Sequence, residues 1–353
     1  MRSALGVPTV RSGNDGGVSL PPFACVGGLW ASELETVSND PVVLDSPGRW
    51  IAVLPYQGKP HFLLFKQWGN VRPAWVRDTW NGPSKASWCS SLDESEYCLA
   101  VARTREAIAR GDVYQANICR VMSAECDTER SLVGLFDRLV AGNPAPYAGI
   151  IHAPEIGIEI VSASPELFLR REGRTLISGP IKGTGRTASD LLAKDLAENI
   201  MIVDLVRNDL SRVCVTGSVE VPRLLEVEEH PGLVHLVSEV GGTLVPGATW
   251  SSILGATFPP GSVTGAPKSS ALRLIEERES VSRSFYCGAL GWVDNEGQSA
   301  ELAVTIRTFW RDGTALRFGT GAGITWESDP AAEWRETELK ARRLIDLASE
   351  GEA

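Results

Sequence analysis

The sequence predicts an α+β fold built on antiparallel β-sheets flanked by helices. Predicted strands come in pairs joined by short polar turns, such as residues 50–56 with 61–66 and residues 167–170 with 175–178. Such pairs are typical of hairpins, in which neighbouring strands run antiparallel. Helical segments stand between groups of strands instead of following each strand, which argues against a doubly wound parallel sheet.

Turn and capping signals define the other elements in order. Ser91 and Glu94 resemble a capping box that opens a helix ending near Ala109. A strand is expected at 156–162. A long helix at 191–210 follows, with apolar residues at 192, 196, 200 and 203. The remaining expected elements are a helix at 271–279, strands at 286–293, 300–309 and 315–319, and a final helix capped by Asp329 with Pro330 at its first position.

Length and composition limit the organisation and the class of protein. The 353 residues fit one large domain or two modest ones, and we expect a motif-poor region 1–90 to pack on the same globule as a motif-rich domain 91–353. The net charge of −10 and the lack of a Lys/Arg cluster argue against a nucleic-acid partner. No apolar run is long enough to predict a membrane span. Seven scattered cysteines without a CxxC pair favour a reducing, cytoplasmic location.

Carboxylates cluster on two predicted helices. Glu333, Glu336 and Lys340 fall within about a 60° arc of the last helix, so they share one face. That face is either a solvated, salt-bridged surface or a site for a hard cation such as Mg²⁺, which takes carboxylate oxygens. Glu198 borders the apolar run 200–203, where a carboxylate is usually paired or bound to metal. The charges that follow at 204–209 are expected to form a structural ion-pair network instead.

Lys182 lies in the run 178–186, between a Pro-Ile turn and a Gly-Thr pair. It is either an ordinary surface charge or a partly desolvated amine that acts as a nucleophile. Glu166 precedes it by one hairpin, so the two side chains can meet and share acid–base work. His235 stands among apolar residues, where a histidine is most often part of the core.

Glycine-rich segments favour close approach of a ligand to the backbone. Residues 255–268 fail the spacing of a phosphate-binding loop, but the hydroxyls of Ser262 and Thr264 there are suited to meet an anion. Residues 319–323 carry three more glycines, and Arg307 is a natural partner for a carboxylate. Together these residues indicate a small ligand with carboxylates, a divalent cation and an amine nucleophile.

At this point the chain resembles a known family, the chorismate-utilising enzymes. The matching segments cover about residues 95–345 in family order. They are GDVYQAN (111–117), SASPELFL (162–169), GPIKGT (179–184), AENIMIVDLVRNDLSRV (197–213), VHLVSEV (234–240), FPPGSVTGAPKSSAL (258–272), YCGALGWV (286–293), AVTIRT (303–308) and GAGITWESDPAAEWRETELKA (321–341).

The resemblance implies a fold of two orthogonally packed antiparallel sheets with helices outside, and a chorismate cleft near their edges. It implies Mg²⁺ held through Glu198 and Glu336 with Glu333 close by, while Arg307 and Tyr286 hold the enolpyruvyl carboxylate. It also makes His235 a catalytic candidate beside Lys182 and Glu166. Other residues expected to line the substrate are Gly183, Thr184, Ser262, Thr264, Gly321, Ala322, Gly323 and Lys340.

Two positions indicate the reaction within the resemblance. Lys182 is typical of 4-amino-4-deoxychorismate synthases, whereas anthranilate synthases carry a small residue there. Gln115 stands where isochorismate and salicylate synthases place a water-activating lysine. The resemblance therefore implies component I of an aminodeoxychorismate synthase, on the route to 4-aminobenzoate and folate. Anthranilate synthase component I, or another chorismate aminase, is the alternative.

The same resemblance implies a mechanism and a partner. Lys182 attacks C2 of chorismate while Glu166 protonates the leaving C4 hydroxyl, and ammonia then attacks C4 and expels the lysine from C2. No Gly-x-Cys-x-Gly elbow is present, so a separate glutamine amidotransferase subunit is expected to supply ammonia. Gly179 replaces an arginine common in relatives, and only Leu44-Asp45-Ser46 resembles their tryptophan pocket, so bound tryptophan is not expected.

Overall fold

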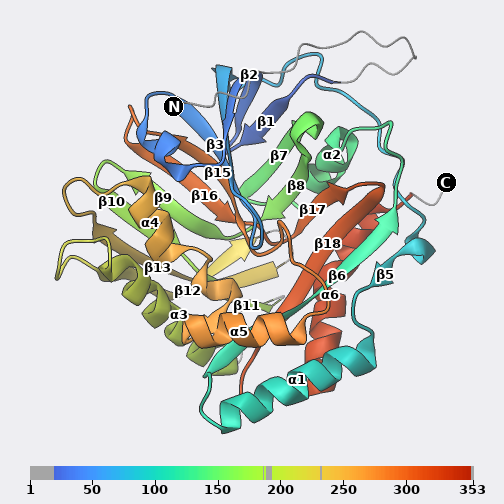
Figure 1. Ribbon diagram of the computed structural model, residues 1–353. Helices are drawn as coiled ribbons and strands as arrows, with labels where there is room; N and C mark the ends of the chain where they lie inside the picture. Colours follow the sequence, from blue (N-terminus) through green and yellow to red (C-terminus); the bar gives the residue numbers. More distant parts are fainter. Residues whose placement is uncertain (1–19, 186, 188–192, 231–232, 351–353) are drawn as a thin grey trace.

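The structure is a computed structural model that describes residues 20–185, 187, 193–230 and 233–350. Its described strands form one continuous network of 18 strands, and every pairing of named strands is antiparallel. Helices lie along the outside of this curled sheet (Figure 1). The predicted α+β class with antiparallel pairing is therefore confirmed. The finer arrangement, two orthogonally packed sheets, stays a prediction.

The chain alternates groups of strands with single helices, and the bounds are as follows. The strands are β1 (Phe23–Val26), β2 (Leu29–Ser38), β3 (Arg49–Leu54), β4 (His61–Gly69), β5 (Cys89–Ser90), β6 (Gln115–Glu125), β7 (Tyr147–Ala153), β8 (Ile158–Ser164), β9 (Leu167–Glu172), β10 (Thr175–Gly179), β11 (Ile181–Gly185), β12 (Glu220–His230), β13 (Leu233–Thr243), β14 (Gly265–Ala266), β15 (Ala289–Asp294), β16 (Ser299–Val304), β17 (Thr308–Asp312) and β18 (Ala315–Ile324). The helices are α1 (Glu94–Ala109), α2 (Val133–Gly142), α3 (Ala193–Ser211), α4 (Trp250–Thr257), α5 (Lys268–Arg278) and α6 (Pro330–Ala348).

The strand pairings join distant parts of the chain. From β13, the network runs through β10, β9, β16 and β15 to the N-terminal strands β3, β4, β2 and β1. From β1 it continues through β7, β8, β17 and β18 to β6. The N-terminal strands thus connect two groups of later strands, while a domain boundary at residue 90 stays a prediction.

Helices cover the outer faces of the sheet and bury its apolar residues. The last helix, α6, packs on β18, α1 and α2, whereas α3 packs on β11, β12 and β13. Fully buried Trp250 and Trp310 belong to the largest cluster of apolar side chains, and burial of such large side chains contributes much of the stability. None of the helices in the described parts of the chain is both long and apolar enough to cross a membrane.

The two predicted hairpins are confirmed, but the start of α1 differs from the prediction. Asp93, not Ser91, is the N-cap: its carboxylate accepts from the Glu96 amide, and the Glu96 carboxylate accepts from the Asp93 amide. The Ser91 hydroxyl instead accepts from the backbone amide of Val121 in β6. The capping box is therefore real but lies two residues further along, because the serine serves the neighbouring strand.

The buried stripe of α3 agrees with the prediction at Val203 and differs from it at 196 and 200, while residue 192 lies outside the described residues. Leu196 and Ile200 are exposed, whereas Ile202, Val203, Val206 and Leu210 are buried. Asn199 belongs to the buried side because its amide oxygen accepts from the Ser238 hydroxyl at 2.6 Å. A satisfied polar residue on the inner face shifts the stripe from the apolar pattern and brings Glu198 into the interior.

Several other elements have bounds that differ from the predicted ones. The strand expected at 286–293 begins only at Ala289, and the one expected at 315–319 extends to Ile324. The strand at 156–162 lies at 158–164, and the helix at 271–279 begins earlier, at Lys268. The strand expected at 300–309 is broken into β16 and β17, and the break concerns Arg307, described below.

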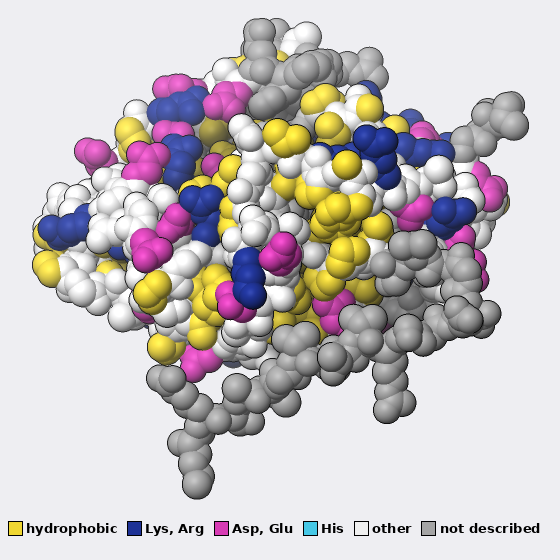
Figure 2. Space-filling view, turned by 90° about the horizontal axis from the view of Figure 1, so that it is seen from above, with side chains coloured by type: hydrophobic (Ala, Val, Ile, Leu, Met, Phe, Trp, Pro, Cys, Tyr) yellow, Lys and Arg dark blue, Asp and Glu magenta, His cyan; other side chains and the backbone are white. Residues whose placement is uncertain are grey.

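The surface carries mixed charges on the face seen from above. Figure 2 shows Lys and Arg side chains scattered among Asp and Glu rather than gathered into one basic patch. The seven cysteines are all unpaired thiols.

Candidate active site

A buried ion pair forms the centre of the candidate site. The Lys182 ammonium of β11 lies 2.8 Å from Oε1 of Glu198 in α3, and both side chains are about nine-tenths buried. The amide nitrogen of Gln115, the first residue of β6, donates to the same Glu198 oxygen at 2.5 Å. The Lys182 amine also donates to the carbonyl of Ser262 at 3.0 Å. Three elements far apart in the sequence thus converge on one carboxylate.

Local backbone features explain how these side chains reach each other. Gly183 has a positive φ of 74°, and the register of β11 against β13 shifts between Lys182 and Thr184. Such a bulge re-aims neighbouring side chains, and glycine adopts this backbone without strain. On the opposite side, a Cβ atom at Gly323 would overlap both Gln115 Nε2 and Glu198 Oε1. Glycine at 323 is therefore required for the close packing of that pair.

Glu166 lies beside Lys182 and is nearly fully buried. Burial raises the pKa of its carboxyl to about 7, although hydrogen bonds from the Ser262 hydroxyl and the Ile181 amide and the charge of Lys182 lower it. Its backbone is fixed between strands, because its carbonyl accepts from the Val304 amide at 3.0 Å. Ser262 thus serves both residues, with its hydroxyl on Glu166 and its carbonyl on Lys182. A carboxyl with this pKa can exchange a proton near neutral pH.

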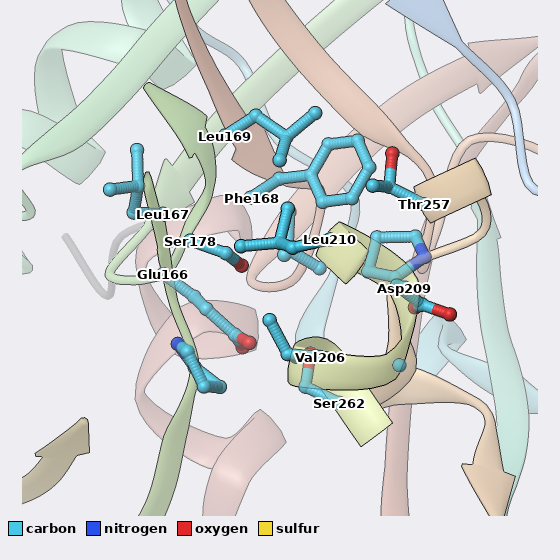
Figure 3. Close-up of a pocket in the computed structure, with 14 residues that line it drawn as sticks. Glu166, Leu167, Phe168, Leu169, Ser178, Val206, Asp209, Leu210, Thr257 and Ser262 are labelled. Atoms are coloured by element: carbon cyan, nitrogen blue, oxygen red, sulfur yellow. The ribbon is translucent and has the colours of Figure 1, made fainter. Parts of the chain in front are cut away.

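A small pocket lies behind Glu166. It is lined by β9 residues, by Val206, Asp209 and Leu210 of α3, and by the 257–262 segment. Figure 3 shows Glu166 and Ser262 on one side of this pocket, with Asp209 and Thr257 at the far end.

The charged residues at 204–209 are paired. The Asp209 carboxylate lies 2.6 Å from the Lys268 amine, and the Asp204 carboxylate lies 2.6 Å from the Arg207 guanidinium. The charges at 204–209 therefore form ion pairs, as expected.

Arg307 occupies the break between β16 and β17. Its φ is +52°, a left-handed backbone that a long side chain rarely adopts. Its carbonyl accepts from the Ala163 amide at 3.0 Å, which holds the kink against β8. Burial lowers the pKa of its guanidinium, and no hydrogen bond or ion pair joins that group to any residue the structure describes. A half-buried guanidinium in this state is suited to bind a carboxylate bidentately.

Tyr286 owes its place to another glycine. A Cβ atom at Gly319 of β18 would overlap the Tyr286 ring, so the ring lies directly on the strand backbone. The side chain is buried, and this burial raises the pKa of its hydroxyl well above the usual range. The phenol therefore stays neutral and can donate a hydrogen bond.

Helix α6 contributes the second group of carboxylates. The Lys340 amine pairs with Glu336 at 2.7 Å and donates to the carbonyl of Gly321 at 3.1 Å. Burial lowers the pKa of Lys340, but Glu336, and to a lesser degree Glu198 and Glu333, raise it above its ordinary value. Of these three carboxylates, Glu336 is the one that pairs with the amine, and the other two act on it through their charge. Glu333 is almost fully buried.

The donor set fits Mg²⁺ in one coordination mode. No group of three His, Cys, Asp or Glu side chains is arranged to hold a metal among the described residues. Mg²⁺, however, commonly uses one or two carboxylates and completes its shell with water and substrate oxygens. The buried carboxylate of Glu198 suits that mode, since an interior carboxylate needs a compensating cation.

The other predicted residues are distributed as follows. Ala322 is buried in the apolar cluster with Tyr97 and Ile118. The Thr264 hydroxyl is buried and donates to the carbonyls of Pro260 and Gly261. His235 pairs with Thr184 in the β11–β13 ladder, but the side chains of both lie outside the described residues.

Sequence reasoning missed one buried pair next to the site. Arg283 is fully buried, contacts Glu279 at 2.6 Å and donates to the carbonyls of Asn117 and Val263. Helical spacing gives no signal for this pair, because α5 ends at Arg278 and both residues follow it. This pair connects the end of α5 with β6 and the Ser262 segment.

Comparison with known proteins identifies the family. A sequence profile described as chorismate binding enzyme matches residues 69–346. The chain belongs to this family. A relative named anthranilate synthase component 1, from Archaeoglobus fulgidus, is 40% identical over 255 residues, which are 69% of this chain and 60% of the relative. The chain spans 54 to 61% of the length of this and other matched anthranilate synthase relatives.

Solved structures of family members share the fold. Anthranilate synthase component I from Streptococcus pneumoniae has a TM-score of 0.75 and 23% identity, covering 97% of this chain and 95% of that one. The menaquinone-specific isochorismate synthase from Escherichia coli has a TM-score of 0.76 and 18% identity, with coverage of 95% and 90%. One fold therefore accompanies differently named reactions, and the residues of the site must decide between them.

Proposed function

We propose that this chain is component I of an aminodeoxychorismate synthase, which converts chorismate and ammonia to 4-amino-4-deoxychorismate. The observation that supports this most is the Lys182 amine, which lies inside the candidate site on Glu198 and Ser262 instead of in solvent. Within the family resemblance, a lysine at this position is typical of amination at C4.

A second function has its own support. The matched relatives with 35 to 40% identity are named anthranilate synthase component 1, and these names favour that alternative over the first proposal. Anthranilate synthases, by the same resemblance, carry a small residue where this chain has Lys182. The identity of the product therefore decides between the two functions.

The side chains present suit a dicarboxylate substrate. Arg307 and Tyr286 would hold the enolpyruvyl carboxylate, since Tyr286 is buried, Arg307 is half-buried, and both can donate hydrogen bonds. The Lys340 amine, which donates to the carbonyl of Gly321, would line the same substrate site. Glu198 and Glu336, with Glu333 close by, would hold Mg²⁺. Bound there, the ion would neutralise and orient the ring carboxylate of chorismate.

The proposed reaction uses Lys182 and Glu166. The Lys182 ammonium first gives up a proton to solvent; its lone pair then forms a bond to C2 of the ring, the double bonds shift, and the C4–oxygen bond breaks. Glu166 gives its proton to the leaving hydroxyl, which departs as water. Ammonia then forms a bond to C4 and the shift reverses, which breaks the C2–nitrogen bond and returns the electron pair to Lys182, while the ammonium formed at C4 returns a proton to Glu166. Burial keeps Glu166 protonated up to about pH 7, as an acid in this step must be.

The ammonia source completes the proposal. A separate glutamine amidotransferase subunit would supply ammonia, and the product would feed 4-aminobenzoate and folate synthesis. Free ammonium replaces this subunit in a test of the isolated chain.

Product analysis tests the proposal. The full chain is incubated with chorismate, Mg²⁺ and saturating ammonium, and the product is identified by mass spectrometry with and without an aminodeoxychorismate lyase. We expect 4-amino-4-deoxychorismate from the wild type and at least a hundredfold lower rate from Lys182→Ala. Lys66→Ala, at an exposed pair, serves as the control. Anthranilate as the product, or an undiminished rate for Lys182→Ala, would overturn the proposal.

A further inference from the structure

We propose that Lys182 is a built-in cation that occupies the metal position on Glu198, so that a divalent ion and the Lys182 ammonium exclude each other there. The inference rests on the metal site of the proposed function and describes how that site is regulated. In this arrangement, binding of the ion releases the nucleophile from its resting contact.

Glu198 Oε1 already accepts two donors. The Lys182 ammonium lies at 2.8 Å and the Gln115 amide at 2.5 Å from this one oxygen. A carboxylate oxygen bound by Mg²⁺ lies about 2.1 Å from the ion. A divalent ion on Oε1 would therefore stand within contact range of the ammonium and repel it at short distance.

The surrounding backbone leaves no room for a third group on one side. Gly323 lies so close to Gln115 Nε2 and Glu198 Oε1 that even a methyl group there would overlap both. An ion that binds Oε1 must therefore displace one of the two donors. The ammonium is the one that it repels, while the neutral amide of Gln115 is not repelled.

Lys182 has a second hydrogen-bond partner, the carbonyl of Ser262. Its amine also donates to the Ser262 carbonyl at 3.0 Å, and the Ser262 hydroxyl donates to Glu166. An amine that leaves Glu198 while keeping Ser262 moves toward the carboxyl that serves as the proposed acid. Arrival of the ion thus transfers Lys182 from the metal carboxylate to the reacting side of the site.

The pairing of Lys340 with Glu336 provides an internal comparison. It places a second lysine on a second proposed metal carboxylate, but both side chains are nearly half exposed. Exposed ion pairs are weak because water and salt screen them. Lys182 and Glu198 are buried, so exclusion should be strong only at Lys182.

Binding of Mn²⁺ to the substrate-free full chain tests the inference. Free Mn²⁺ is measured by electron paramagnetic resonance for the wild type, Lys182→Met, Lys182→Gln, Lys340→Met, Glu198→Gln and the exposed control Lys66→Met. We expect both Lys182 variants to bind Mn²⁺ at least tenfold tighter than the wild type. Lys340→Met should gain about threefold or less, Lys66→Met should not change, and Glu198→Gln should lose binding.

A second measurement guards against misfolding of a variant. Lys182→Met should melt at a lower temperature than the wild type without metal, because Glu198 is left without its cation, and Mn²⁺ should raise its melting temperature more than that of the wild type. Unchanged or weaker Mn²⁺ binding by both Lys182 variants would overturn the inference, as would an equal gain in Lys340→Met. Absence of Mn²⁺ binding in every protein would also overturn it. The assay contains no chorismate, so none of these results depends on which product the chain makes.

Discussion

Glu166 shows how one residue can couple function to stability. Its carboxyl is buried at the junction of β8 and β9, and burial raises its pKa from 4.5 to about 7. The folded state therefore holds the proton more tightly than the unfolded state. The stability contributed by this proton is fully present below about pH 4.5 and is lost as the pH rises to about 7.

Replacement of Glu166 by glutamine should remove this pH dependence. The amide resembles the protonated carboxyl and carries no charge to bury. We expect Glu166→Gln to be more stable than the wild type at pH 8 by about 3 kcal/mol, and nearly equal at pH 4.5. Urea unfolding at the two pH values measures the difference. A variant less stable than the wild type at pH 8 would show that the buried charge is compensated.

Gly323 is a residue whose missing side chain has a function. We expect Gly323→Ala to push Gln115 and Glu198 apart and to lower the rate of chorismate conversion by at least a hundredfold, because the new methyl group overlaps both side chains. Gly255, in α4, has nothing within 4 Å of a Cβ position and is the matched control. Gly255→Ala should keep full activity and gain up to about 1 kcal/mol in stability. If Gly323→Ala were as active as Gly255→Ala, the proposed need for glycine at 323 would be wrong.

At the scale of elements, a few side chains connect segments that would otherwise separate. Arg283 follows the end of α5 and reaches the carbonyls of Asn117 in β6 and Val263 beside Ser262. Its partner Glu279 also accepts from the Cys119 amide at 2.8 Å. Both charges are buried, and each compensates the other.

Removal of the Arg283 charge should therefore be costly. We expect Arg283→Met to lower the free energy of unfolding by about 3–5 kcal/mol, because it leaves Glu279 as an uncompensated buried charge. Arg207, which pairs with Asp204 on the surface of α3, is the control. Arg207→Met should change stability by less than about 1 kcal/mol. Denaturant unfolding of both variants measures this, and a loss below 1 kcal/mol at Arg283 would contradict the argument.

Some elements followed directly from local sequence and others did not. The hairpins at β3–β4 and β9–β10 follow from short polar turns between apolar runs, which act locally. The break at Arg307 could not be predicted, since a left-handed backbone at an arginine is held by contacts with β8 rather than by its neighbours in sequence. The buried stripe of α3 was misplaced for a similar reason, because Asn199 is satisfied by Ser238 on a distant strand.

At the scale of the whole molecule, the N-terminal strands hold the sheet together. β3 pairs with β15 and β1 pairs with β7, so the strands before residue 90 lie between two groups of later strands. Their loss would expose two sheet edges and the apolar side chains beneath them.

A fragment of residues 91–353 tests this role. We expect it to lack cooperative thermal unfolding and to aggregate, in contrast to the full chain, because β15 and β7 lose their partners. Circular dichroism in the near ultraviolet and light scattering report the two effects. A fragment that melts cooperatively near the temperature of the full chain would instead support an independent domain from residue 91.

The sequence alone determined the fold class, the family resemblance and most candidate residues, because turn signals, periodicity and motif spacing act over short stretches of chain. Tertiary structure alone decided that Lys182 and Gln115 meet on one oxygen of Glu198, since those residues come from three elements. It also decided that Arg307 is half-buried at a kink in the backbone, and that burial raises the pKa of Glu166 to about 7. Such properties depend on desolvation and on strand pairings between distant segments, which no local pattern encodes.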